Sequence, residues 1–337
     1  MKIYLLAPNY CWHTSDLIKL NTYNKKLEYI FIADTPPFIS RKIFKRYFSF
    51  MFFPYEFFQR FWRIFLLIPW SIYLRIKLSN KTPIHCHGLF ALIIARFAKI
   101  DSKRIVFTPQ GSDLLVLPEK NFLVRKFLKN NLFLLRYITA DSNLLLKKSL
   151  YICPKLNKNK LRLIQNGIPL DKIRNLVKKK KSIKRREIDI CWIRGFGENY
   201  QFEYFLLLIQ ILSDLTSSSI NISIISAYGS KAIPKQIFNL HNININLLPR
   251  LTSDDFLKCI YNSKIIISIP LSDSSPRSVY ESIFLGCKLF ITKLDCLNWL
   301  PNDLKNDFIY FTGNLKKDAK QIIYALDNFN EKKDLQK

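Results

Sequence analysis

Two carboxylates, Asp273 and Glu281, flank a turn with the sequence Ser-Ser-Pro-Arg-Ser in this 337-residue chain. The apolar run 264–270 precedes the turn and the amphipathic stretch 280–286 follows it, which predicts a buried strand, a ligand-binding loop and the start of a helix. Backbone N–H groups at a helix N-terminus can hold a phosphate, while acids beside it accept hydrogen bonds from sugar hydroxyls. Residues of these types at this spacing are suited to binding a nucleotide-sugar.

Two further residues of the second half follow strand-like runs. Arg194 ends the run 188–193, and a permanently charged, bidentate guanidinium can offset the negative charge of a departing diphosphate. Gly229 follows the run 220–225, where the absence of a Cβ allows a ligand to approach the backbone closely. We keep both residues as candidate binding residues; the family resemblance described below implies that they lie on the donor site with the two carboxylates.

Polar residues in the first half form a separate candidate group. Gln110, Gly111 and Asp113 lie in the loop after the strand-like run 104–108, and His87 ends an earlier run. An equally favoured interpretation of the loop is a helix cap. Histidines two positions apart are more often structural than metal-binding. We keep the four residues as candidate binding residues, which the family resemblance described below implies to be on the side of an acceptor, and we expect neither a metal nor a cofactor.

The elements that must position these residues alternate along the chain, which favours parallel sheets wound with helices. The strand-like runs cover 3–6, 29–33, 84–87, 104–108 and 137–140, and then 188–193, 220–225, 243–247, 265–270, 288–292 and 308–310. The alternation pauses near Asn166, and the basic run 178–186 is interpreted as an exposed linker or loop. We predict an α/β protein of two doubly wound domains, 1–166 and 167–337. Whether the last helix, from Leu315, packs back on the first domain is left open.

Composition narrows the class of protein. Hydrophobic residues make up 49% of the chain, enough for two cores, and the 53 Lys and Arg against 25 Asp and Glu give a net charge of +28. Such a surface favours anionic lipid, phosphorylated substrates or nucleic acid. The seven cysteines contain no Cys-x-x-Cys pair, which argues against a disulfide framework and a zinc site. No run reaches the roughly 18 apolar residues of a membrane span, and we expect a cytoplasmic protein, peripheral on the inner face of the membrane.

The segment 41–77 combines aromatic and basic side chains. Fourteen aromatic residues lie between Phe44 and Tyr73, interleaved with Lys and Arg and with one acid, Glu56. This pattern favours contact with an anionic leaflet. Packing in the first-domain core is the alternative. Stacking on single-stranded nucleic acid would suit the same residue types, but no nucleic-acid motif accompanies them, and we expect no nucleic-acid partner.

Taken together, these segments resemble a retaining glycosyltransferase of family 4, of the bacterial cell-surface polysaccharide type. The resemblance covers most of the chain and is strongest from Leu161 to Thr292, where the family's two-carboxylate motif has the form Ser-Asp-x-x-Pro-x-Ser-x-x-Glu. The resemblance implies the GT-B fold, in which two facing Rossmann-like domains enclose a cleft. The first domain would hold the acceptor and the second the nucleotide-sugar.

The resemblance also implies roles for individual residues. Glu281 would bind the ribose hydroxyls of the donor, Asp273 the hydroxyls of the transferred sugar, and the amides near Ser278 and Val279 the diphosphate, which Arg194 would neutralise. The family's lysine about five residues after this arginine is replaced by Asn199-Tyr200-Gln201, so Tyr200 or a basic residue from elsewhere must help. Gln110 replaces a histidine of the family, and in a retaining transferase the leaving phosphate can take the acceptor proton instead.

The expected activity is that of a retaining hexosyltransferase. It would transfer a sugar from a nucleotide-sugar to a lipid-linked acceptor of lipopolysaccharide or polysaccharide biosynthesis, with peripheral membrane contact through 41–77. Retention follows from the resemblance and not from any spacing. Two other interpretations stay open: a nucleotide-sugar epimerase on the same fold, and a catalytically weak membrane-bound partner protein.

Overall fold

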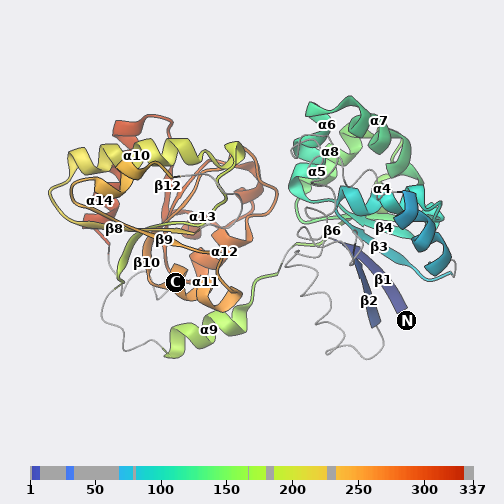
Figure 1. Ribbon diagram of the computed structural model, residues 1–337, viewed down its shortest axis with the longest axis horizontal. Coiled ribbons are helices and arrows are strands. Elements are labelled where there is room, and N and C mark those ends of the chain that lie inside the picture. Colours follow the sequence, from blue (N-terminus) through green and yellow to red (C-terminus); the bar gives the residue numbers. More distant parts are fainter. Residues whose placement is uncertain are drawn as a thin grey trace, which may run out of the picture. The chain divides into compact units, whose positions relative to one another are not determined.

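A computed structural model divides the chain into two compact units, Met1–Gln165 and Asn166–Lys337 (Figure 1). The structure describes residues 2–7, 28–33, 68–78, 81–165, 167–179, 186–225 and 233–329. Gly229, Asn166 and the part 41–67 of the basic-aromatic segment lie outside these ranges.

The first unit is built on a parallel sheet of six strands in the order β2-β1-β3-β4-β5-β6. The strands are β1 (Lys2–Ala7), β2 (Glu28–Ala33), β3 (Ile84–His87), β4 (Ile105–Thr108), β5 (Tyr137–Ala140) and β6 (Leu161–Leu163). At the centre of the sheet Tyr4 pairs with Ile84, and Ile84 pairs with Ile105. The chain runs outward from β1 to β2 and then continues on the other side of β1, so the strand order reverses between β1 and β3.

The helices of the first unit connect successive strands. They are a helical segment over 68–77, α4 (Leu89–Phe97), α5 (Gly111–Leu115), α6 (Leu117–Lys120), α7 (Phe122–Asn131) and α8 (Asn143–Ile152), with 3-10 turns η1 (Ser102–Arg104), η2 (Leu132–Leu134) and η3 (Lys158–Lys160). Apolar side chains at alternate strand positions, such as Ile105 and Phe107, share one buried core with Leu74, Leu92 and Leu128 of these helices. The described helices that contribute to this core therefore lie on one face of the sheet, as expected for right-handed crossovers between these parallel strands.

Short polar residues fix where these helices begin. The side-chain oxygen of Asn121 accepts hydrogen bonds from the backbone N–H groups of Leu123 and Val124 at the start of α7. Ser142 accepts from the N–H of Leu145 at the start of α8. Such caps satisfy donors that the first helical turn leaves unpaired, and they set the turns that follow β5 and precede α7.

The second unit repeats the plan with a parallel sheet in the order β12-β11-β10-β7-β8-β9. Its strands are β7 (Ile188–Trp192), β8 (Ile220–Ile225), β9 (Ile243–Leu248), β10 (Ser263–Ser268), β11 (Lys288–Ile291) and β12 (Phe308–Tyr310). Its helices are α9 (Leu170–Lys179), α10 (Phe202–Leu215), α11 (Ser253–Tyr261), α12 (Arg277–Phe284), α13 (Asn302–Lys305) and α14 (Leu315–Asp327), with 3-10 turns η4 (Glu198–Tyr200), η5 (Lys235–Asn239) and η6 (Asp295–Leu297).

Two cores lie on opposite faces of this second sheet (Figure 1). Successive residues of a strand point to opposite faces, and in β7 Trp192 joins the core under α10 and α14 while Cys191 joins the core under α11 and α12. Trp192 stacks on Phe205 of α10, with ring centroids 4.6 Å apart. The closing helix α14 packs on α10 of its own unit through buried residues such as Ile322.

The basic run 178–186 differs from its interpretation as an exposed linker. Lys178 lies within α9, and Arg186 is buried. The Arg186 guanidinium donates to the backbone carbonyls of Ser263 at 2.6 Å and Leu285 at 2.8 Å. A buried charge is tolerated when it is hydrogen-bonded. These hydrogen bonds fix the residues just before β7 against β10 and the end of α12. Residues 180–185 lie outside the described ranges, and no helix of the described part is long and apolar enough to span a membrane.

Candidate active site

The candidate donor site lies at the point where the strand order of the second sheet reverses. The chain goes from β7 outward to β8 and β9, and then returns to the other side of β7 as β10, with Ile265 paired to Ile190. In open α/β sheets, ligands bind beyond the carboxyl ends of the strands at such a reversal. Arg194 follows β7, and the loop with Asp273 follows β10. The topology therefore brings together two segments that are far apart in the sequence.

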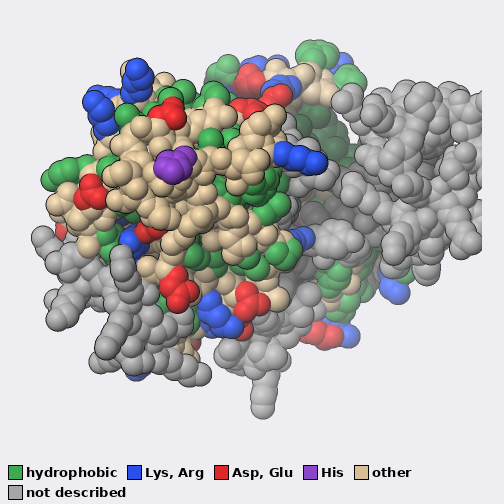
Figure 2. All heavy atoms as spheres, turned by 60° about the vertical axis from the view of Figure 1, so that its left-hand side comes forward, with side chains coloured by type: hydrophobic (Ala, Val, Ile, Leu, Met, Phe, Trp, Pro, Cys, Tyr) green, Lys and Arg blue, Asp and Glu red, His purple; other side chains and the backbone are tan. Residues whose placement is uncertain are grey.

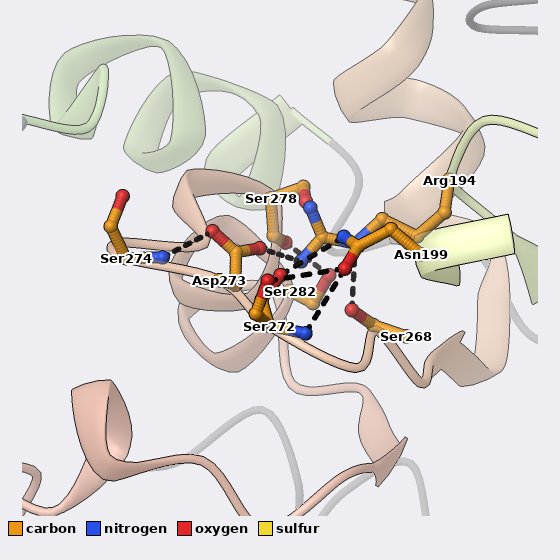
Figure 3. Close-up of polar contacts among 8 residues, drawn as sticks. All are labelled: Arg194, Asn199, Ser268, Ser272, Asp273, Ser274, Ser278 and Ser282. Atoms are coloured by element: carbon orange, nitrogen blue, oxygen red, sulfur yellow. Dashed lines mark hydrogen bonds and ion pairs between the residues drawn. The ribbon is translucent and has the colours of Figure 1, made fainter. Parts of the chain in front are cut away.

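The Arg194 side chain is the centre of the polar contacts in Figure 3. Its Nη2 atom lies 3.0 Å from Oδ2 of Asp273, and its Nε atom donates to Oγ of Ser268 at 2.7 Å. The guanidinium also stands 5.8 Å from the ring centroid of Tyr200. Only 12% of the Arg194 side chain and 19% of the Asp273 side chain are exposed. Three sequence-predicted residues are thus neighbours, and the charges of the arginine and the acid offset each other.

Asn199 holds the loop that carries Asp273. Its backbone carbonyl accepts from the N–H of Leu271 at 2.7 Å, and its side-chain oxygen accepts from the N–H and the hydroxyl of Ser272 at 3.2 and 3.1 Å. Its amide nitrogen donates to the Ser272 carbonyl at 3.0 Å. Sequence reasoning noted this residue only as a replacement of a lysine. Its bracing role depends on a contact across 73 positions, for which the sequence carries no signal.

Glu281 lies one turn into α12 and is paired on its own helix. Its Oε1 atom accepts from Nε of Arg277 at 3.0 Å, and only 7% of its side chain is exposed. The spacing of four positions places the two side chains on one helix face. Asp273 does not cap this helix: α12 begins after Pro276, and the carboxylate accepts instead from the N–H of Ser274 at 2.8 Å.

In the first turn of α12, one of the two amides predicted to bind a diphosphate is already hydrogen-bonded within the protein. The N–H of Val279 donates to the Pro276 carbonyl at 2.9 Å, as does that of Tyr280 at 3.2 Å, so the Val279 amide is already engaged. The N–H of Ser278 has no protein acceptor within the described part of the chain. Of the two amides predicted from the sequence, that of Ser278 is the one available to an anion.

The acceptor-side residues of the first unit form a second cluster, where the loops after β3 and β4 meet. Oδ2 of Asp113 accepts from the backbone N–H groups of Leu89 at 2.9 Å and Gln110 at 2.8 Å. Gly88 stands beside both loops with a φ of 92°, and a Cβ placed there would lie 3.8 Å from Oδ2 of Asp113 and 3.9 Å from Nε2 of Gln110. Glycine is therefore required for its backbone conformation. Burial raises the pKa of the Asp113 carboxyl, and Gly111 begins α5 between the two polar residues.

The two histidines of β3 lie side by side in the first unit. Their rings meet edge to face with centroids 6.0 Å apart, and His87 is buried. Nε2 of His85 lies 2.7 Å from Oγ1 of Thr108, which is hydrogen-bonded in turn to the hydroxyl of Thr139. Burial lowers the pKa of His85 to about 4, so this ring is neutral at physiological pH. His85, which was not a candidate, therefore belongs to a chain of two hydrogen bonds that links β3, β4 and β5.

No model of a known protein family matches the sequence, and no curated protein matches it. Solved structures do resemble the chain. HepE of Anabaena in complex with UDP-glucose is 12% identical, with a TM-score of 0.62 over 100% of this chain and 97% of that one. A UDP-forming α,α-trehalose-phosphate synthase from Burkholderia xenovorans is 10% identical, with a TM-score of 0.65 over 99% and 94%. The N-terminal domain of trehalose-6-phosphate phosphatase from Candida albicans is 12% identical, with a TM-score of 0.67 over 99% and 91%.

At these identities the likeness establishes the fold. The protein has the GT-B fold, with two Rossmann-like domains that each contain a six-stranded parallel sheet. The fold class predicted from the sequence is confirmed.

Proposed function

We propose that the protein is a glycosyltransferase that binds a nucleotide-sugar donor in its second unit. The observation that carries this proposal is the cluster of Arg194, Asp273 and Ser268 at the strand-order reversal of the second sheet, followed by the Ser278 amide at the start of α12. A guanidinium and a helix-terminal N–H offset charge that develops on a departing diphosphate. The solved structures of the same fold support the proposal, since one holds UDP-glucose and another forms UDP.

In the finer proposal, the enzyme is a retaining hexosyltransferase of family 4. Asp273 and Glu281 bind hydroxyls of the transferred sugar and the ribose, and Gly229 lies on the donor side although it falls outside the described residues. Gln110, Gly111, Asp113 and His87 contact the acceptor. Two backbone N–H groups hold Oδ2 of Asp113 in place, and in the proposed route the leaving phosphate takes the acceptor proton.

The proposed acceptor is a lipid-linked glycan of lipopolysaccharide or polysaccharide biosynthesis, reached from the inner face of the cell membrane. The described end of the segment 41–77 supports this proposal. In the helix over 68–77, Ile68, Ile72 and Ile76 are exposed, with Lys77 beside them. An apolar stripe flanked by basic side chains is suited to a membrane interface.

Purified full-length protein should be incubated with membrane lipid extract and a panel of labelled nucleotide-sugars, and the lipid and aqueous products separated. We expect label in the lipid fraction with one donor, lost in Arg194→Gln and kept in Asp303→Asn, a matched change of an exposed residue on α13. Release of a free sugar or its epimer would favour the epimerase instead. Two results together would favour a non-catalytic partner and refute the proposal. They are the lack of product with any donor, and cells in which Glu281→Gln replaces the wild-type protein without loss of its function.

A further inference from the structure

The second sheet has a cavity at its amino-terminal edge, where β7, β8 and β10 begin and α14 ends. Its volume is about 520 Å³, within the range of roughly 300–1,000 Å³ that is typical of ligand sites. Because Arg194 and Asp273 follow the carboxyl ends of parallel strands, the cavity lies at the opposite edge of the sheet from the proposed donor site. The side chains that line it include Glu187, Asp189, Ser218, Asn221, Lys264 and Asp327.

Polar contacts across four neighbouring strands hold one wall of this cavity in place. Nζ of Lys264 on β10 donates to Oδ1 of Asp189 on β7 at 2.6 Å, and the two side chains are 15% and 13% exposed. The backbone N–H of Asn221 on β8 donates to Oδ2 of Asp189 at 2.8 Å, and Asn244 on β9 donates to Oδ1 of Asn221 at 3.1 Å. The two largely buried charges are paired, so this wall adds no net charge, and groups that are fixed beforehand lose little freedom when a ligand binds.

Two exposed carboxylates of the cavity are available to a ligand. Glu187 precedes β7 and Asp327 ends α14, and neither carboxylate has a hydrogen bond or an ion pair within the described part of the chain. A carboxylate only accepts hydrogen bonds, whereas the hydroxyl of Ser218 can both donate and accept. Ile323 and Leu326 of α14 add apolar surface. The cavity is therefore suited to a ligand with hydroxyl donors and apolar C–H surface, and it disfavours anions.

The described surface beside the cavity is formed largely by uncharged polar side chains. No Lys, Arg, Asp or Glu occurs in the sequence from 215 to 230 or from 236 to 249, although these types make up 23% of the chain. Figure 2 shows uncharged side chains and backbone around a histidine of this unit. Asn244 donates to Oγ of Ser219 at 3.0 Å, so β9 continues the cavity wall. The exposed polar residues here include Ser217, Ser219, Asn239, His241, Asn244 and Asn246. Such a surface binds through hydrogen bonds and not through charge.

We propose that this cavity binds a neutral oligosaccharide. Hydroxyls of the sugar donate to the carboxylates of Glu187 and Asp327, while a C–H face of the ring packs on Ile323 and Leu326. The uncharged surface along β9 lets the chain of sugars continue beyond the cavity. An acidic or phosphorylated ligand would instead meet two unpaired carboxylates, and an apolar one would leave the polar wall without partners. This site goes beyond the proposed function, because it lies at the opposite edge of the sheet from the donor site and needs no sugar transfer.

Saturation-transfer NMR on the full chain tests the class of ligand. The probes are maltotriose, mannotriose and galactotriose, which are neutral, and trigalacturonate, which is anionic. We expect at least one of the neutral trisaccharides to bind, and calorimetric titration then gives its Kd. If none of the three neutral trisaccharides gives a signal, the proposal is wrong.

Two matched pairs of variants test whether the trisaccharide lies in the cavity. Ser218→Tyr fills the cavity and should abolish binding, whereas Ser217→Tyr adds the same ring at an exposed neighbour that does not line it and should leave binding unchanged. Asp327→Ala removes a carboxylate acceptor and should weaken binding by about tenfold or more, because hydrogen bonds to charged groups are stronger than those to neutral groups. Asp303→Ala, at an exposed position of α13, should bind as the wild type does.

Three further results would overturn the proposal. Equal losses in Ser217→Tyr and Ser218→Tyr would mean that the trisaccharide binds outside the cavity, and loss of binding in Arg194→Gln or in the presence of UDP would place it in the donor site. Trigalacturonate that binds more tightly than the neutral probes and is lost in Ser218→Tyr would mean an anionic ligand. Thermal melting detects misfolded variants, and if Ser218→Tyr does not fold, the comparison of Asp327→Ala with Asp303→Ala decides the outcome. UDP titration tests the donor site separately, so a wild type that binds a trisaccharide but no UDP would refute the proposed function and support this site.

Discussion

Replacement of Asp273 by Asn is expected to tighten the binding of nucleoside diphosphates while it lowers sugar transfer. The Asp273 carboxylate lies 3.0 Å from Nη2 of Arg194. A diphosphate that uses this guanidinium must compete with the carboxylate, and it also meets the negative charge of Asp273. The amide of Asn keeps the size of the side chain but removes both effects.

The magnitude follows from the distance and the burial of the pair. With an effective dielectric constant of about 20, two charges 3.0 Å apart attract by about 5 kcal/mol. Dehydration of the two groups, which are 12% and 19% exposed, offsets most of this attraction. We expect a net gain of about 1–2 kcal/mol for the diphosphate, or roughly five- to thirtyfold in Kd. Arg194→Gln should weaken binding by about a hundredfold, because it removes the charged donor itself.

Calorimetric titration of UDP and GDP into the wild type, Asp273→Asn, Arg194→Gln and the double variant measures these terms. In the Arg194→Gln background, Asp273→Asn should no longer tighten the binding of the diphosphate, because the carboxylate there has no guanidinium to pair with. Asp303→Asn, at an exposed position of the same unit, should bind as the wild type does. If Asp273→Asn binds no tighter than this control, the diphosphate does not compete for Arg194 and the assignment of the site is wrong.

Three further predictions concern pairs that the structure defines. Asp113→Asn should leave the unfolding free energy at neutral pH unchanged or higher, and Asp113→Ala should lower it by about 2–3 kcal/mol, because only Asn keeps an oxygen for the two backbone N–H groups. Burial raises the pKa of Asp113 above its unfolded value, so the stability tied to its protonated form is lost as pH rises through the raised pKa. Denaturant titrations at several pH values should show this fall in unfolding free energy for the wild type and not for Asp113→Asn. The pKa of His85 is lowered to about 4, so the wild type should lose about 1–2 kcal/mol between pH 7 and 5 that His85→Gln keeps; equal pH slopes for the two proteins would contradict this. Arg277→Gln should cost about 2 kcal/mol by leaving Glu281 buried without its arginine, and the double variant with Glu281→Gln should recover part of the loss in thermal melts; additive losses would argue against the pair.

Most strands of both sheets could be predicted because they are rich in β-branched apolar residues. Isoleucine occupies four of the six positions of β8, and β10 contains three isoleucines in succession. The edge strand β6 was not predicted, because Leu161–Leu163 is only three residues long and two of the three are exposed. Without burial, a short strand has no periodicity that distinguishes it from a loop.

In the candidate site, too, the residues could be predicted from local sequence, whereas their contacts with residues distant in the sequence could not. Arg194 and Asp273 were found from residue type and position after a strand, which are local properties. Their mutual neutralisation could not be predicted, because it depends on β7 and β10 being neighbours. The burial of Arg186 was missed for the same reason: within a basic run, its charge indicated solvent, while its acceptors lie 77 and 99 positions away.

The charged side chains of the proposed donor site form two ion pairs within the protein. Arg194 pairs with Asp273, and Arg277 pairs with Glu281. The stretch Asn199-Tyr200-Gln201 near this site carries no charge, and Asn199 fixes the loop at Ser272. Under the proposed function, a diphosphate would open an existing pair to gain a cation, which would lower its affinity. The same pair would re-form when the nucleoside diphosphate leaves, which would favour product release.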